Sequence, residues 1–357
     1  MVNAKIDRGG VNNQLDLSPS EKIVLKKADS IEELLSNCPK NQTIGDNLIR
    51  AWAKINSPKY KKIMCSISGG SDSDVMLDIV WRCDKDNKVD YVWFDTGLEY
   101  QATKEHLLFL ENKYGIKIKR HKPKKPIPIC CKEYGQPFIS KRVSECIAAL
   151  QRHNFEFNDE PYEILIEKYP QISSYIKWWC NVYNPINSQW NIARNKYLKE
   201  FLIENPPCFK VSNKCCDYAK KKISKDIMLR GDYNLKIMGI RKSEGGIRSV
   251  KYKSCFIENE NSYDTYMPLF WYTNKDKLDY ETHFNIEHSK CYLEYGMART
   301  GCAGCPYERK IEDELKIISQ YEPKLYKAVN YIFGDSYEYT REYREFRKEM
   351  EENNTKK

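Results

Sequence analysis

The chain has 357 residues, of which 41% are hydrophobic and 31% are charged. This apolar share is enough to bury a sizeable core and excludes disorder along the whole chain. No window approaches the ~18 uninterrupted apolar residues of a membrane span, and the first residues lack an apolar signal segment. We therefore expect a soluble, cytoplasmic protein, with one large domain or two ordinary ones at ~100–200 residues each.

Charge and cysteine content both depart from the average. Lys plus Arg (59) exceeds Asp plus Glu (50), for a net charge of +9, and the chain has 14 cysteines. An excess of cations favours an anionic partner without identifying it. Cysteines without a secretory signal indicate metal or thiol chemistry rather than disulfides. Burial as small hydrophobic residues accounts for about half of them.

The first half of the chain alternates between strand and helix patterns. After a polar lead-in over residues 1–30, apolar spacing predicts two helices within 31–55, separated at Cys38-Pro39. Short apolar runs predict strands at 63–67, 89–94 and 116–119, with helices between them up to Cys83 and over about 102–114. This alternation indicates a parallel sheet covered on both faces, whose ligands bind at the carboxyl ends of the strands.

The second half is mostly helical. A basic extended linker at 122–126 precedes predicted helices such as 144–153 and 191–202, a strand at 235–240, and a charged helical segment at 311–352. We predict an α/β fold in three parts. These are a helical lead-in (1–60), a domain at 61–310 with a helical insertion at about 130–230, and a charged helical tail (311–357).

One glycine-containing string carries a chemical signal. Ser68-Gly69-Gly70-Ser71-Asp72-Ser73 lies between a predicted strand and a predicted helix. Its glycines let the backbone approach a ligand, its N–H groups face outward from the helix start, and its serines add hydroxyl donors. The string suits a phosphate, although it matches neither the Walker nor the dinucleotide pattern. The plainer alternative is a tight turn in which Asp72 caps the helix.

In this context the string resembles the PP-loop ATP pyrophosphatases, whose signature SGGxDS it matches in full. Residues 95–99 (Asp-Thr-Gly-Leu-Glu) resemble the second loop of the sulfonucleotide (PAPS) reductase branch of that superfamily. The strings at 239–241 with Arg248, at 268–271 and at 301–306 extend the resemblance over roughly residues 45 to 310.

The resemblance implies a Rossmann-like sheet of the adenine nucleotide alpha-hydrolase type that binds ATP or adenylylsulfate. It assigns ATP contacts to eight residues: Ser68, Gly69, Gly70, Ser71, Asp72, Ser73, Asp95 and Thr96. Asp72 and Asp95 are also candidate Mg²⁺ ligands, and Asp72 and Arg241 are candidate catalytic residues. Lys214, Arg241 and Arg248 are candidate phosphate or sulfate clamps, although a single arginine is more often a surface residue.

The cysteine spacing resembles two families that bind a [4Fe–4S] cluster. Cys215-Cys216 with Cys302-x-x-Cys305 is similar to the adenylylsulfate reductases, whose cysteines of this kind hold the cluster. Cys291 with the same C-x-x-C is similar to the Dnd-type DNA phosphorothioation ATPases, and then the cysteine pair supplies the fourth ligand. Reduced thiols without metal are the alternative. A simple zinc ribbon is not expected, because the chain has one C-x-x-C.

Two departures from the reductases decide which chemistry we prefer. Those enzymes use a nucleophilic cysteine in a C-terminal tail, but the chain after Cys305 has none, and it keeps the full ATP-splitting signature. We therefore predict an enzyme that uses ATP, Mg²⁺ and a [4Fe–4S] cluster to adenylate an acceptor and support sulfur transfer. The net charge and the lysines at 122–125 and 220–222 favour DNA or tRNA as acceptor. A sulfur-donor protein such as a cysteine desulfurase is an expected partner.

Two alternatives stay open. A sulfonucleotide reductase with an external thiol would release sulfite from an adenylylsulfate. A non-enzymatic nucleotide- or nucleic-acid-binding accessory protein with a structural cluster would keep its function after Asp72→Ala.

Overall fold

The computed structural model describes residues 25–245, 251–260 and 262–355. Its single sheet runs in the order β3-β2-β1-β4-β6-β5. The first five of these strands are parallel, and β5 pairs antiparallel to β6. The strands are β1 (Ile63–Ile67), β2 (Val89–Phe94), β3 (Ile118–His121), β4 (Leu235–Met238), β5 (Phe256–Ile257) and β6 (Asp264–Tyr266). The predicted α/β class with a Rossmann-like parallel sheet is confirmed.

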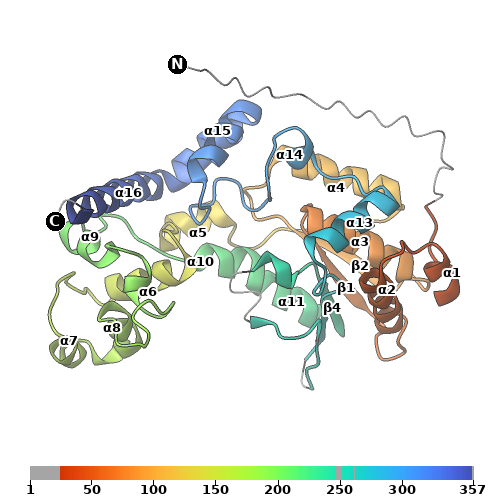
Figure 1. The fold of residues 1–357 in the computed structure, drawn as a ribbon, viewed down its shortest axis with the longest axis horizontal. Coiled ribbons are helices and arrows are strands. Elements are labelled where there is room, and N and C mark those ends of the chain that lie inside the picture. The colour runs from red at the N-terminus through yellow and green to blue at the C-terminus, as the bar shows by residue number, and fades with distance from the viewer. Residues whose placement is uncertain (1–24, 246–250, 261, 356–357) are drawn as a thin grey trace, which may run out of the picture.

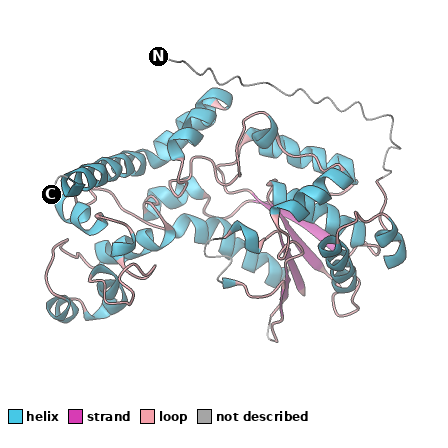
Figure 2. Ribbon diagram, viewed as in Figure 1, coloured by secondary structure: helices cyan, strands magenta, loops and turns pink. Residues whose placement is uncertain are grey.

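Helices near the sheet pack on its faces (Figures 1 and 2). Apolar residues of β1, β2 and β4 pack with these helices in one core, which includes Ile63, Val75 and Leu235. The helices of this part are α1 (Ile31–Ser36), α2 (Gln42–Ile55), α3 (Ser71–Cys83), α4 (Gln101–Tyr114), α11 (Ile223–Arg230), α13 (Asn274–Phe284) and α14 (Lys290–Leu293).

A second, helical part lies to one side of the sheet (left in Figure 1). Its core joins the middle of the chain to the last helix, because Tyr339 and Tyr343 pack among Phe138, Phe201 and their neighbours. Its helices are α5 (Ile127–Tyr134), α6 (Lys141–Arg152), α7 (Tyr162–Lys168), α8 (Ser173–Trp179), α9 (Leu198–Glu204), α10 (Lys214–Cys216), α15 (Ile311–Tyr321) and α16 (Pro323–Thr355). Short 3₁₀ turns occur at η1 (Pro170–Ile172), η2 (Ile192–Arg194) and η4 (Lys242–Glu244), and η3 (Asp217–Lys222) is a π-helix.

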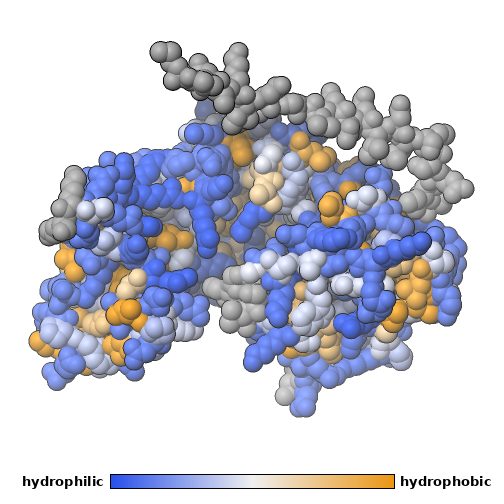
Figure 3. Space-filling model, viewed as in Figure 1, coloured by the Kyte–Doolittle hydropathy of each residue, from blue (hydrophilic) through white to orange (hydrophobic). Residues whose placement is uncertain are grey.

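The surface seen in Figure 3 is mainly hydrophilic over both parts, and hydrophobic residues appear on it in small separate patches. None of the helices in the described ranges combines the length and apolar composition needed to cross a bilayer. The proposed boundaries at residues 60, 130, 230 and 310 stay predictions.

The parallel order brings three loops to one edge of the sheet. The order of strands reverses at β1, which pairs with β2 on one side and β4 on the other. The residues after these strands therefore meet at the carboxyl edge, where ligands bind in such sheets. Ser68, Asp95 and Gly239 are the first residues beyond the three strands.

Candidate functional site: a phosphate loop and a cysteine cluster

The string from Ser68 to Ser73 is the turn between β1 and α3. The Ser68 N–H donates to Ser73 Oγ at 2.9 Å, which closes the turn. Gly69 has φ of 69°, and a Cβ there would lie 2.8 Å from Thr103 Cγ2, so the position requires glycine. α3 begins at Ser71, so the N–H groups of its first turn lie at this loop. The turn therefore has the geometry of an anion site at a helix N-terminus.

Asp72 is held by two cations at the start of α3. Its carboxylate accepts from Arg241 Nε at 2.8 Å and lies 3.1 Å from Lys277 Nζ. Lys277 also donates to Ser71 Oγ at 2.7 Å, and Arg241 donates to Asn274 Oδ1 at 2.9 Å. The structure thus brings the predicted Arg241 to the phosphate loop. It adds Lys277 of α13, which sequence reasoning missed because no motif surrounds it.

A network of buried and half-buried charged side chains connects α3 to α13 next to the phosphate loop. Asp74 is buried, and its carboxylate lies 3.1 Å from His106 Nε2 and 2.8 Å from His288 Nδ1. His288 Nε2 lies 2.9 Å from Glu281 Oε1, which in turn lies 3.2 Å from Lys277 Nζ. Burial alone would lower the pKa of His288, but its hydrogen bonds to the two carboxylates raise it to about 9. A cationic His288 therefore links α3 to α13.

Asp95, which follows β2, is also paired with a cation. Its carboxylate accepts from Arg120 Nε at 2.9 Å and from the Gly97 N–H at 3.0 Å. Burial opposes ionisation, but these donors outweigh it and lower the pKa of Asp95. Both candidate Mg²⁺ ligands, Asp72 and Asp95, thus have basic partners. No three His, Cys, Asp or Glu side chains in the described ranges are arranged to hold a metal ion. The described residues therefore do not by themselves form a Mg²⁺ site.

Cysteines from three segments converge beside the phosphate loop. The Cys215 thiol lies near those of Cys131, Cys216 and Cys305. Cys305 in turn lies near Cys302 and Cys216. Burial raises the pKa of Cys305 to about 12 and also raises the pKa of Cys302. We call these five residues the cysteine cluster.

The cysteine cluster contains both predicted pairs, and it adds Cys131. Cys131 belongs to a second vicinal pair, Cys130-Cys131, whose sequence gives no choice between simple burial and a functional role. Cys291 is placed differently, because its Sγ lies 3.8 Å from Thr103 Oγ1 and its hydrogen-bonding neighbours in the described chain are Thr103 and Ser289. Which four thiols bind iron stays a prediction.

The donor set of the cysteine cluster fits an iron–sulfur cluster better than a single ion. All 14 cysteines in the chain are free thiols, including these five. Each of the four thiolates that usually hold a [4Fe–4S] cluster binds a different iron, so these thiolates lie farther apart than the ligands of one ion. A convergent set of five buried or half-buried thiols therefore agrees with such a cluster, although the thiols surround no closed single-metal site.

The second loop connects the sheet edge to the C-x-x-C. Thr96 lies near the Cys302 thiol, and its hydroxyl donates to Glu99 Oε1 at 2.6 Å. The Ala303 N–H donates to the Leu98 carbonyl at 2.9 Å. Lys220, on the π-helical η3, lies near Cys302, and this proximity raises the pKa of the Lys220 ammonium. Part of Lys220 stays exposed, so the side chain reaches inward from the surface.

Residues 291–305 connect the phosphate loop to the cysteine cluster. The Tyr292 hydroxyl accepts from the Ser71 N–H at 3.1 Å and lies 3.0 Å from Thr300 Oγ1. The same segment ends in the C-x-x-C, and residues of α15 and α16 hydrogen-bond to this motif. The Gly304 N–H donates to Glu314 Oε1 at 3.0 Å, and its carbonyl accepts from Tyr337.

The two other predicted clamps have no demonstrated place at the phosphate loop. Lys214 begins α10 directly before the cysteine pair and forms no ion pair within the described ranges. Arg248 falls outside the residues that the structure describes.

Comparison with known proteins defines the class. Residues 62–153 match the family described as "Phosphoadenosine phosphosulfate reductase domain". Residues 62–153 are therefore similar to the PAPS reductase domain, and the predicted resemblance is confirmed over this segment. The Dnd-type branch stays a prediction.

Individual proteins match this chain only in part or at low sequence identity. An uncharacterized protein of Methanocaldococcus jannaschii is 32% identical over 178 residues, which are 48% of this chain and 35% of the relative. The chain thus spans about a third of that relative's length. Two solved structures are similar. A Candida auris PAPS reductase has 14% identity, coverage of 78% of this chain and 96% of that chain, and a TM-score of 0.38. A Methanococcus maripaludis U34-tRNA thiolase with its [4Fe–4S] cluster has 13% identity and a TM-score of 0.36. The match covers 87% of this chain and 81% of that chain.

Proposed function

We propose that this protein is an ATP pyrophosphatase-type enzyme that adenylates an acceptor oxygen so that sulfur can replace it. The observation that carries this proposal is the direct connection between the two halves of the site. Residues 291–305 contact the phosphate loop through Tyr292 and reach the cysteine cluster at Cys302. Activation by ATP and sulfur chemistry at thiols are then neighbouring steps on one acceptor.

In the first step, the acceptor oxygen attacks the α-phosphorus of ATP. The bond from this phosphorus to the bridging oxygen breaks, and pyrophosphate leaves with the electron pair. Any proton on the acceptor oxygen passes to solvent. Arg241 and Lys277 stabilise the negative charge that develops on the pyrophosphate, and Asp72 orients both cations. In the second step, a sulfide-level nucleophile attacks the carbon that bears the adenylate. The carbon–oxygen bond breaks and AMP leaves.

The cysteine cluster is the proposed site of a [4Fe–4S] cluster. Cys302 and Cys305 lie on one loop and supply two thiolates, and two of Cys131, Cys215 and Cys216 supply the other two. When bound, such a cluster supplies iron to which sulfur can attach. Lys220 places a positive charge next to Cys302, which offsets part of the rise in thiol pKa that burial causes.

A product assay with anaerobically purified protein tests this function. We expect ATP to yield AMP and pyrophosphate when tRNA or DNA is present with sulfide. Lys277→Ala removes a cation at the phosphate loop and should abolish most of this turnover. Lys275→Ala is the matched control, because Lys275 is on the same helix and pairs with Asp279 at the surface. Formation of ADP, or no turnover with any nucleic acid, would contradict the proposal.

Sulfonucleotide reduction is the second candidate, because the family match is to a PAPS reductase domain. In that case adenylylsulfate or its 3′-phosphate and an external dithiol would yield sulfite. The assay measures sulfite release with each nucleotide. Sulfite release from one of them, without AMP formation from ATP, would favour the reductase.

A further inference from the structure

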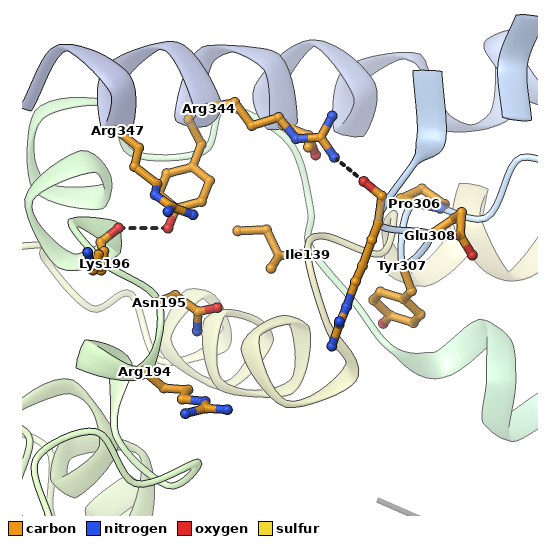
Figure 4. A pocket seen from close by; sticks show the side chains of 12 residues that line it. Ile139, Arg194, Asn195, Lys196, Pro306, Tyr307, Glu308, Arg344 and Arg347 are labelled. Carbon is orange, nitrogen blue, oxygen red and sulfur yellow. Dashed lines mark hydrogen bonds between the residues drawn. The ribbon is translucent and has the colours of Figure 1, made fainter. Parts of the chain in front are cut away.

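A basic cavity adjoins the cysteine cluster (Figure 4). It has a volume of about 470 Å³ and opens between the loop after Cys305, residues 194–196 and α16. Its lining includes one carboxylate, Glu308, and five cationic side chains: Arg194, Lys196, Arg309, Arg344 and Arg347. The five cations are all exposed, so they can meet a ligand from solvent.

Three of these cations lack a compensating acid. Lys196 and Arg347 both lie near Glu351, at 3.8 Å and 3.0 Å. Arg194, Arg309 and Arg344, by contrast, form no ion pair with any residue in the described ranges, and Arg344 only donates to the Arg309 carbonyl at 3.0 Å. Unpaired guanidinium groups with planar donors are well suited to phosphate.

The cavity leads toward the thiols. A neighbouring cavity of about 270 Å³ shares Asn195 and Lys196 with it and continues to the start of α9. At the other end, Tyr307 lines the cavity and lies near the thiols of Cys215 and Cys305. A ligand bound along this surface therefore has one end next to the cysteine cluster.

We propose that this cavity binds the phosphodiester backbone of a nucleic acid and directs the bound strand toward the cysteine cluster. The idea that this nucleic acid is the acceptor rests on the proposed function, whereas the binding site itself does not. The unpaired cations come from three separate segments, and Arg194 and Arg344 lie on opposite sides of the cavity in Figure 4. They therefore suit successive phosphates of a strand better than one small anion, since backbone phosphates are the main source of nucleic-acid affinity.

Binding measurements with a charge-matched control test this proposal. The triple variant Arg194→Gln, Arg309→Gln, Arg344→Gln is compared with Lys324→Gln, Lys327→Gln, Lys348→Gln. The control residues are exposed on α16 outside the cavity, and both variants lose three positive charges. The probes are fluorescein-labelled tRNA, single-stranded RNA, and single- and double-stranded DNA. Anisotropy is measured across a salt series, and thermal unfolding verifies that both variants fold.

We expect the cavity variant to bind at least one probe about tenfold more weakly than the control. The negative slope of log association constant against log salt concentration should become shallower by about 2 to 3. The probe that shows this loss identifies RNA or DNA as the ligand. Equal losses in the two folded variants would overturn the proposal. Cavity-dependent binding without AMP formation would contradict the proposed function and leave the binding site standing.

Discussion

The phosphate loop and the cysteine cluster lie close together but are built in different ways. The loop consists of six consecutive residues, and Gly69 and the first turn of α3 determine its shape. The cluster joins three segments that are far apart in sequence, and packing of α5 against α10 and α16 brings them together. The first site therefore depends on local backbone geometry and the second on the tertiary fold. The two should respond differently to substitution.

The largest expected effect separates the two sites. The double variant Cys302→Ser, Cys305→Ser removes both thiols of one loop, so we expect most bound iron and sulfide to be lost. The affinity for ATP should stay unchanged, because the phosphate loop contains neither residue. Metal analysis of anaerobic protein and calorimetric titration of ATP measure the two properties. Cys291→Ser is the control and should retain iron, because its thiol faces Thr103. Loss of iron in this control would favour the ligand set that includes Cys291.

The converse variant affects the phosphate loop. Arg241→Ala removes a cation that contacts Asp72, and we expect AMP formation to fall about 10²- to 10³-fold, as for loss of one preorganised donor. Iron content should stay the same. Arg241→Lys should restore little, since the guanidinium also donates to Ser243 and Asn274. A large loss of iron in either variant would show that the two sites are not independent.

The network below the loop makes stability depend on pH. The pKa of His288 is raised from about 6.5 to about 9. Its protonated form therefore contributes stability fully below pH about 6.5, and this contribution is lost as pH rises through about 9. The size is on the order of 3 kcal/mol. Urea unfolding between pH 6 and 10 should show this decline in the native protein and a flatter profile in His288→Gln. An equal decline in both proteins would exclude His288 as its source.

The smallest expected effect tests the local character of the loop. Gly69→Ala forces a side chain into positive φ and against Thr103, so we expect a loss of about 1–3 kcal/mol of unfolding free energy. Adding Thr103→Ser removes the methyl group that the new Cβ would meet and should recover part of this loss. Urea unfolding measures both changes. No difference between the single and double variants would mean that backbone strain alone sets the cost.

Sequence patterns predicted the elements whose signals are local. The predicted strands at 63–67 and 89–94 have those same bounds in the structure, because short apolar runs there are buried between helices. The predicted helix over 191–202 is wrong in its middle. It is divided into η2 and α9 around Tyr197, which has φ of 58°. Strands β5 and β6 have only two and three residues, too few for a periodic pattern.

The sequence by itself determined the phosphate loop, since six adjacent residues contain both the glycines and the donors that an anion needs. Only the tertiary structure decided which distant side chains complete the site. Lys277 reaches Asp72 from α13, and Cys131 reaches Cys215 from α5, with no local pattern to mark either residue. The physical reason is that contacts across the chain depend on how helices pack against the sheet and one another. Spacing along the sequence records only contacts within an element.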